Sequence, residues 1–162
     1  MSTPEEAFRQ HREALVRYVF QLTADTAAAE DVVQETYMRL LESEPEDDNL
    51  RAWLFTVATN LVRDRSRVAS RRRELEAGEP DPAPAPSAEE RAEERQRLRA
   101  VWSAIDRLPG RDRALLLLRV EGLTYEEIAE AVGVAKGSVG PLTGRALQRL
   151  REELGDAERE PT

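Results

Sequence analysis

The sequence contains no cysteine and only one histidine, His11, among its 162 residues. Without cysteine the chain can form no disulfide, no thiolate nucleophile and no zinc-cysteine site, and one histidine cannot build a histidine-based metal site alone. The sequence also offers no nucleophile with a neighbouring base and no glycine-rich phosphate loop. We therefore expect a protein that is not an enzyme and that uses neither a metal nor a cofactor.

Long apolar runs and aromatic residues are scarce as well. No stretch approaches the roughly 18 consecutive apolar residues of a membrane helix, and Met1 is not followed by a charged and then apolar leader. These absences predict a cytoplasmic protein without membrane insertion. Only three Phe, three Tyr and two Trp are present, which favours modest helical cores over a single large core.

Lysine is nearly missing, because Lys136 is the only lysine among the 24 basic residues, and the net charge is -8. Residues 1–73 carry -2 and residues 99–154 carry +1, whereas residues 74–98 carry -5 and residues 155–162 carry -2. Binding to a phosphate backbone needs clustered positive charge. Such a chain would therefore bind DNA weakly by itself, and a partner would have to supply further charge.

The N-terminal part of the sequence has the pattern of two amphipathic helices. Thr3 and Glu6 form a capping box around Pro4, and the first helix extends to about Thr23. The second begins near Asp25, and its apolar face consists of Ala29, Val32, Val33, Thr36, Tyr37, Leu40 and Leu41. Its other face gathers four polar side chains: Asp31, Gln34, Glu35 and Arg39. Periodicity alone fits either a solvated face or a docking surface for another protein's charged helix.

A long third helix is expected after Asn49, a residue type that suits an N-cap. Its buried stripe comprises Leu50, Trp53, Leu54, Val57, Ala58, Leu61 and Val62. A second face, at steps of three or four residues, presents Thr56, Asn60, Asp64, Arg67 and Arg71. Between Arg63 and Arg73 there are six arginines and one acid. This density suits a nucleic-acid backbone, although a helix C-terminus also attracts cations through its dipole.

Residues 74–87, ELEAGEPDPAPAPS, have the composition of a linker rich in acid, proline and alanine. Ser87 and Glu90 then form a further capping box and open a charged helix. Four apolar side chains of that helix are expected to turn inward: Leu98, Val101, Trp102 and Ile105. A short helix over residues 111–120 contains four consecutive leucines, which predicts burial on all sides. Residues 155–162 are expected to be frayed.

Residues 124–150 have the spacing of a helix-turn-helix. Thr124 and Glu127 form a capping box, and Gly133 can take the positive φ with which the chain leaves the first helix of the pair. This arrangement favours DNA binding. An ordinary helical hairpin is the alternative.

The second helix of this pair would enter the major groove. We expect it to start at Ser138, because a start at Lys136 would leave Pro141 in its interior with a lost hydrogen bond. Its apolar stripe is Val139, Leu142, Ala146 and Leu150, and its outward ridge is Gly137, Pro141, Gly144 and Gln148. Three of the four ridge residues have no side chain that can bond a base edge. Direct readout of the bases then falls to Lys136, Ser138, Arg145 and Gln148.

The two halves together resemble the alternative sigma factors of the extracytoplasmic-function (ECF) group, in which sigma domain 2, a linker and sigma domain 4 follow one another. AEDVVQETYMRL at residues 29–40 resembles the family's core-polymerase-binding helix, and RAWLFTVATNLVRDRSR at residues 51–67 resembles its promoter-melting helix. LPGRDRALLLLRVEGLTYEEIAEAVGVAKGSV at residues 108–139 resembles domain 4, which reads the upstream promoter element.

The resemblance implies an all-α fold of two small helical domains joined by a Pro/Ala/acidic linker. Sigma domain 2 would occupy residues 1–73, the flexible linker residues 74–87, sigma domain 4 with its helix-turn-helix residues 88–154, and a frayed tail residues 155–162. The implied partners are core RNA polymerase and promoter DNA, with an anti-sigma factor as a further candidate. Because the polymerase would supply most of the positive channel, an acidic chain is no contradiction.

The resemblance also implies roles for particular residues. Docking on core polymerase would fall to Asp31, Gln34, Glu35 and Arg39. The downstream promoter element would face Asn60, Arg63, Asp64, Arg67 and Arg71. The sequence departs from the family in the acidic loop Glu42 to Asp48, where members hold a flipped promoter base, and in the glycine-rich recognition helix.

Two alternatives remain beside a promoter-specificity subunit. A stand-alone helix-turn-helix regulator would bind its operator without polymerase. A sigma-like decoy would bind core polymerase and lack promoter function. The recognition helix is compatible with this alternative because most of its outward ridge has no side chain that can bond a base.

Overall fold

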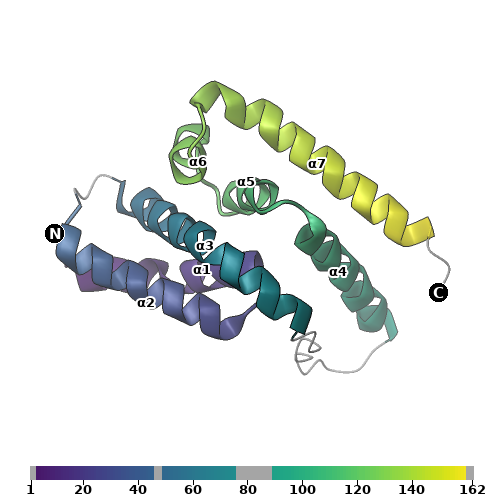
Figure 1. Ribbon diagram of the computed structural model, residues 1–162, viewed down its shortest axis with the longest axis horizontal. Helices are drawn as coiled ribbons and strands as arrows, with labels where there is room; N and C mark the ends of the chain where they lie inside the picture. Colours follow the sequence, from purple (N-terminus) through teal and green to yellow (C-terminus); the bar gives the residue numbers. More distant parts are fainter. Residues whose placement is uncertain (1–2, 46–48, 76–88, 160–162) are drawn as a thin grey trace.

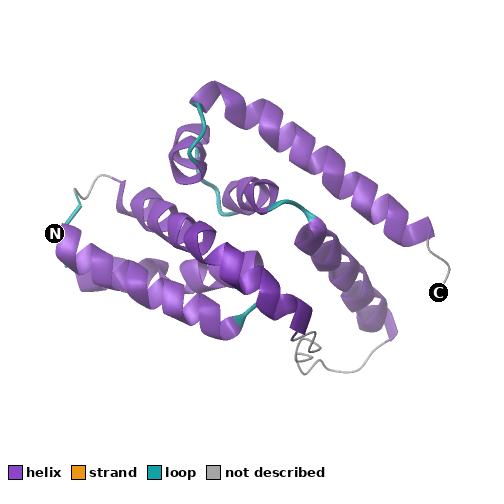
Figure 2. Ribbon diagram, in the orientation of Figure 1, coloured by secondary structure: helices purple, strands orange, loops and turns teal. Residues whose placement is uncertain are grey.

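In a computed structural model, the chain forms helices and no strands within the residues described, which are 3–45, 49–75 and 89–159 (Figure 2). Residues 66–75, 89–90 and 156–159 are described by their backbone only. The helices are α1 (Pro4–Thr23), α2 (Thr26–Ser43), α3 (Leu50–Leu75), α4 (Glu89–Arg107), α5 (Gly110–Val120), α6 (Tyr125–Val132) and α7 (Lys136–Arg159). None of these described helices is sufficiently long and apolar to span a bilayer. The all-α fold class is confirmed.

Local sequence signals determine where the first two helices begin and end. Thr3 Oγ1 accepts a hydrogen bond from the Glu6 backbone N–H at 3.2 Å, and Glu6 Oε2 accepts one from the Thr3 N–H at 3.1 Å, so the predicted capping box forms. Ala24 ends α1 in the left-handed conformation with φ 53°. Asp25 then caps α2 by accepting from the Ala28 N–H at 3.2 Å. This two-residue connection reverses the chain, and α2 packs back along α1 (Figure 1).

The N-terminal half is a three-helix bundle, because α3 packs against both α1 and α2. In its centre the rings of Tyr18 and Phe55 pack edge to face with centroids 5.2 Å apart. The Tyr18 hydroxyl lies 2.7 Å from Thr59 Oγ1, which itself donates to the Phe55 carbonyl at 2.6 Å. Burial raises the pKa of Tyr18. The only polar group that this ring brings into the core is therefore hydrogen-bonded.

The helix-turn-helix forms where the sequence predicts it. The Thr124 and Glu127 side chains accept each other's backbone N–H groups at 3.2 and 3.0 Å. Gly133 takes φ 80°, and its N–H donates to the Ala129 carbonyl at 2.8 Å, which closes the last turn of α6. A side chain with a Cβ would be strained at this φ. The turn therefore sets the angle at which α7 leaves α6.

The two halves share one apolar core, so the expectation of separate modest cores was wrong. The larger buried cluster extends from α1, α2 and α3 into α5, α6 and α7 without a break. α3 packs on α6, and α1 packs on α5. Leu115 and Leu118 of α5 are both fully buried, because α5 lies between the N-terminal bundle and α7 (Figure 1). A helix that is apolar all round needs cover on more than one side.

The recognition helix α7 begins at Lys136, two residues before the predicted start at Ser138. The Ser138 N–H donates to the Ala135 carbonyl at 2.9 Å, so the first turn is already closed there. Pro141 consequently lies inside the helix. The residue before a proline normally resists the helical conformation because its Cβ meets the proline ring, and Gly140 has no Cβ. The glycine explains how the helix continues through the proline.

Two further expectations about the C-terminal half were also wrong. Leu98 is 52% exposed and Trp102 is 37% exposed, although Ile105 is buried as expected. α7 covers one side of α4, which leaves the other edge of the apolar stripe in solvent. α7 continues to Arg159, so the described residues 155–159 are helical and not frayed. The capping box expected at Ser87 lies outside the described residues.

Candidate nucleic-acid and protein interface

The polar face of α2 presents the four predicted docking residues together. Asp31, Gln34 and Arg39 are exposed and Glu35 is half-buried. Glu35 Oε1 accepts from Arg39 Nη2 at 3.2 Å, and Glu35 Oε2 accepts from Arg65 of α3. Glu35 and Arg39 are therefore linked to each other and to the neighbouring helix, and the role of this face in docking stays a prediction.

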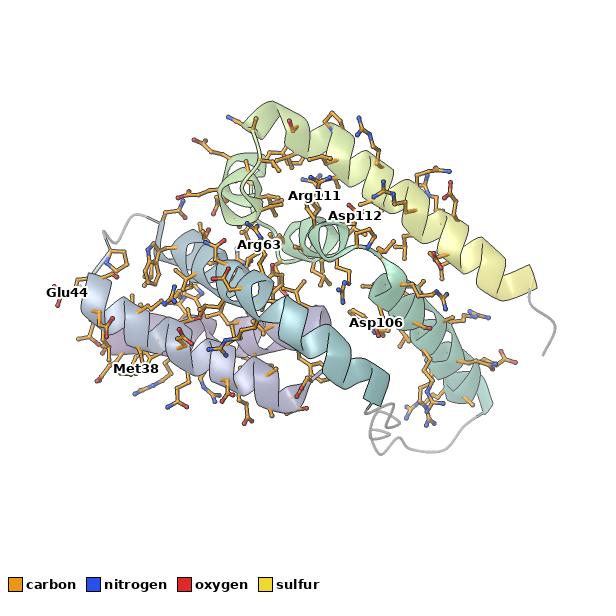
Figure 3. The ribbon with its side chains drawn as sticks, viewed as in Figure 1. Met38, Glu44, Arg63, Asp106, Arg111 and Asp112 are labelled. Atoms are coloured by element: carbon orange, nitrogen blue, oxygen red, sulfur yellow. The ribbon has the colours of Figure 1, made fainter. Side chains whose placement is uncertain are left out.

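Sequence reasoning missed the apolar side chains beside this face. Met38 is 50% exposed, and Leu41, which was expected to be buried, is 42% exposed. Figure 3 shows Met38 on the outer side of α2, away from the C-terminal half. Met38 follows Asp31 by seven residues and Gln34 by four, so helical spacing could have placed it on the same ridge.

The candidate DNA face of α3 is only partly separate from the C-terminal half. Asn60, Arg63 and Asp64 are largely exposed. Arg63 nevertheless donates from Nη2 to the Val132 carbonyl of α6 at 2.6 Å, and it lies between α3 and the helix-turn-helix (Figure 3). The side chains of the other two predicted residues, Arg67 and Arg71, are outside the described residues.

Arginines join the two halves by bonding groups at helix ends. Arg113 Nη1 of α5 donates to the Leu22 carbonyl at the end of α1, at 3.0 Å. Arg51 of α3 donates to the backbone carbonyl of Glu121, the C-cap residue of α5. Arg17 of α1 binds the Glu121 carboxylate through Nε at 3.2 Å and Nη2 at 3.1 Å, and this hydrogen bond raises the pKa of Arg17. Terminal carbonyls carry partial negative charge, so guanidinium groups suit them.

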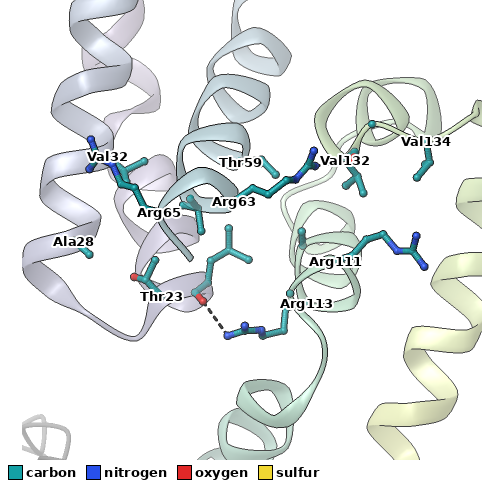
Figure 4. A pocket seen from close by; sticks show the side chains of 15 residues that line it. Thr23, Ala28, Val32, Thr59, Arg63, Arg65, Arg111, Arg113, Val132 and Val134 are labelled. Atoms are coloured by element: carbon teal, nitrogen blue, oxygen red, sulfur yellow. Dashed lines mark hydrogen bonds between the residues drawn. The ribbon is translucent and has the colours of Figure 1, made fainter. Parts of the chain in front are cut away.

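A cavity of about 520 Å³ lies between the halves. Its cationic lining comes from Arg63, Arg65, Arg111 and Arg113, and no carboxylate is among the described residues that line it. Its apolar walls come from Leu22, Ala28, Val32, Val62, Ala114, Val132 and Val134. Figure 4 shows Arg113 bonded to Leu22, and Arg111 turned outward toward α7. The cavity therefore has apolar walls and four arginines in its lining, of which Arg65 is paired with Glu35.

The outward ridge predicted for α7 is exposed along its length. It comprises Gly137, Pro141, Gly144 and Gln148. A Cβ placed on Gly137 or Gly144 would meet no atom within 4 Å. Of the predicted reading residues, Arg145 is exposed, Ser138 is half-buried, and Lys136 lies with Nζ 3.7 Å from the Glu126 carboxylate. The geometry supports an accessible ridge, and base reading by its neighbours stays a prediction.

The sequence matches families and proteins that are already known. The family model for Sigma-70 region 2 matches residues 7–72, and the model for Sigma-70, region 4 matches residues 98–150. RNA polymerase sigma factor CarQ of Myxococcus xanthus is 30% identical over 161 residues, which cover 96% of this chain and 91% of that protein. The chain belongs to the ECF family of RNA polymerase sigma factors. The family resemblance seen in the sequence is thereby confirmed.

Other relatives of this ECF sigma factor differ in length. ECF RNA polymerase sigma factor SigE of Mycolicibacterium smegmatis is 33% identical over 161 residues, but the chain covers only 62% of that protein against 95% of itself. Among solved structures, the sigma factor RpoE of Bartonella quintana in complex with the anti-sigma factor NepR has a TM-score of 0.70 and 26% identity, with 93% of this chain and 96% of that chain covered. The fold of this chain thus has a solved counterpart.

Proposed function

We propose that this chain binds core RNA polymerase in the cytoplasm and directs promoter-specific initiation of transcription, without being an enzyme itself. The observation that carries the proposal is the order of the two sigma regions, region 2 before region 4. Each region also presents its own exposed face, on α2 and α3 in the first and on α7 in the second.

Core docking is assigned to the polar face of α2. Asp31 and Gln34 project into solvent, and the carboxylate of Glu35 is oriented by two guanidinium groups. The adjacent exposed Met38 adds apolar area. An interface with a small apolar centre and a charged rim is typical of reversible protein complexes.

Promoter opening is assigned to the basic end of α3, and upstream recognition to α7. Arg63 is hydrogen-bonded to α6 in the closed arrangement, so it cannot direct the same N–H groups at DNA until the halves separate. Binding to polymerase would have to supply the free energy of that separation. The acidic chain would then meet DNA inside a complex whose positive charge comes mainly from the polymerase.

An anti-sigma factor is a further proposed partner. The solved relative RpoE is held by the anti-sigma factor NepR. In this chain the space between the halves has apolar walls, four arginines and no carboxylate among its described lining residues. An acidic segment with an apolar face fits that chemistry and would hold the closed arrangement.

Run-off transcription with purified core polymerase on a pool of genomic DNA fragments tests the proposal. The expected result is discrete transcripts that require both proteins. A footprint by the chain alone would favour the stand-alone regulator. Tight binding to core polymerase with no transcript from any fragment would favour the decoy and overturn the proposal.

The docking face can be tested separately. Changing Asp31, Gln34 and Glu35 together to alanine should abolish core binding and leave the melting temperature nearly unchanged, because exposed polar residues and the solvent-accessible ion pairs of Glu35 contribute little to folding. A matched control changes three exposed residues of α1 to alanine: Arg9, Gln10 and Glu13. Wild-type affinity for core polymerase in the first variant would refute the assignment of α2.

A further inference from the structure

One exposed arginine near the recognition helix is paired with an aromatic ring instead of a carboxylate. Arg119, in the last turn of α5, places its guanidinium carbon 4.9 Å from the centroid of the Tyr125 ring. Both side chains are exposed, Tyr125 by 39%. No described acidic side chain forms an ion pair with Arg119, whereas Arg17, Arg107 and Arg149 each have a carboxylate. A stacked guanidinium keeps its N–H donors available at the ring edge.

Tyr125 connects this guanidinium to the recognition helix. A Cβ placed on Gly140 of α7 would lie 3.7 Å from Tyr125 Cε2, so the ring rests against the second turn of α7. The adjacent Glu126 pairs with Lys136 at 3.7 Å, also between α6 and α7. The capping box fixes Tyr125 as the first residue of α6. Arg119 is therefore placed beside α7 through an aromatic contact.

The position is on one flank of the exposed ridge of α7. At about 100° per residue, Gly140 lies about 70° to one side of the mean direction of the ridge, and Arg145 lies about 70° to the other side. A helix in the major groove has the phosphates of the two strands on its two flanks, because the groove is about 12 Å wide and a helix with side chains is about as broad. Arg145 thus lies on one flank of α7, and Arg119 of α5 lies beside the other, where the exposed Arg151 also lies about three turns further along the helix.

We propose that Arg119 contacts a DNA backbone phosphate of the upstream promoter element and that Tyr125 is its positioning residue, on the strand opposite to the one that Arg145 approaches. The inference rests on the proposed function. Because three of the four ridge residues, Gly137, Pro141 and Gly144, have no side chain that can bond DNA, side-chain contacts at the flanks have to contribute to the register of the helix in the groove. Phosphate contacts fix register and carry no sequence information themselves.

Salt dependence of DNA binding distinguishes this role from a structural one. The probe is a promoter duplex selected from a randomised pool by wild-type holoenzyme, and a second duplex has its upstream half scrambled. Arg119→Gln should lower the slope of log K against log salt by about 0.9, because one phosphate contact is lost. The ratio of wild-type affinity to variant affinity should therefore fall about 3.5-fold between about 50 and 200 mM salt. The loss should be equal on both duplexes.

Companion variants test the stacking. Tyr125→Phe keeps the ring and should retain the wild-type slope and affinity. Tyr125→Leu keeps apolar contact with α7 but frees the guanidinium, and should lose part of the affinity. Arg97→Gln, an exposed arginine of α4, is the matched control and should change nothing.

The outcomes distinguish failure of this inference from failure of the proposed function on which it rests. If wild-type holoenzyme selects no duplex, the proposed function fails and the inference with it. If wild type binds and Arg119→Gln keeps the wild-type slope, the phosphate contact is refuted and the proposed function stands. If Tyr125→Leu behaves like wild type, Tyr125 is not a positioning residue.

Discussion

Arginine contacts between the halves should control how often the free chain opens. We consider the double variant Arg17→Ala with Arg113→Ala, because neither residue is assigned to DNA or polymerase. It removes the two bonds from Arg17 to the Glu121 carboxylate and the bond from Arg113 to the Leu22 carbonyl. The apolar contacts between the halves remain.

The size of the effect follows from burial. The Arg17 side chain is 52% exposed, so the pair alone contributes little, but the Glu121 side chain is 7% exposed and would lose its charged partner. We expect Arg17→Ala to destabilise the closed arrangement by about 2 kcal/mol, and the loss of the Arg113 bond to destabilise it by about 1 kcal/mol. About 3 kcal/mol corresponds to a shift of roughly a hundredfold in the equilibrium between closed and open chains. An open population of about 0.1% would rise to about 10%.

Single-molecule energy transfer measures that population. The natural chain has no cysteine, so dyes can be attached at cysteines introduced for the exposed residues Arg9 of α1 and Arg151 of α7. The control is Arg107→Ala, which breaks an ion pair with Glu153 at 2.7 Å inside the C-terminal half. This control should leave the transfer distribution unchanged.

Charge exchange gives the sharper test. Arg17→Glu should open the chain more than Arg17→Ala, because two carboxylates would then face one another. Adding Glu121→Arg to Arg17→Glu should restore part of the closed population. An unchanged distribution in the double alanine variant, or no recovery in the exchanged pair, would refute the reasoning that these contacts hold the halves together.

Three further outcomes are expected. Replacing Arg63 and Arg67 by glutamine should weaken open-complex formation more than core binding, and equal loss on duplex and pre-melted templates would contradict a role in opening. Burial raises the pKa of Tyr18 above its ordinary 10.0, so its neutral form stabilises the fold below pH 10 and this contribution is lost as the pH rises further. Tyr18→Phe should remove this loss of stability at alkaline pH, measured as the free energy of unfolding in urea titrations. Single base-pair changes in the upstream element should each cost less than the roughly 1–3 kcal/mol of a read position, and a sharp preference that Gly144→Ala abolishes would instead indicate deep insertion of α7.

The sequence could predict the elements whose causes are local. The capping boxes at Thr3 and Thr124 and the left-handed Gly133 depend on residues within four positions of one another, and all three formed as predicted. The order of the two sigma regions was readable for the same reason, since each region is a contiguous pattern. The outward ridge of α7 followed from helical spacing alone.

Contacts between the halves could not be predicted in this way. Arg63 and Arg113 donate hydrogen bonds to backbone carbonyls. Because every residue type has a backbone carbonyl, the acceptor cannot be identified from the sequence. The four leucines of α5 indicated burial on all sides but not which helices would cover them. The start of α7 was misjudged because the cost of Pro141 was weighed without considering that Gly140, the residue before it, has no Cβ to meet the proline ring.

Net charge and closed packing should both weaken DNA binding by the free chain. The charge of -8 weakens attraction to phosphate at every salt concentration. The closed arrangement also engages Arg63, one of the few cations on the candidate melting face, with the end of α6. On the proposed function, separation of the halves on polymerase would release that guanidinium where the polymerase adds its own positive charge. Promoter binding would then depend on the complex for two independent reasons, the net negative charge and the closed packing. The double variant Arg17→Ala with Arg113→Ala should relieve the closed packing only, because it removes two positive charges and adds none.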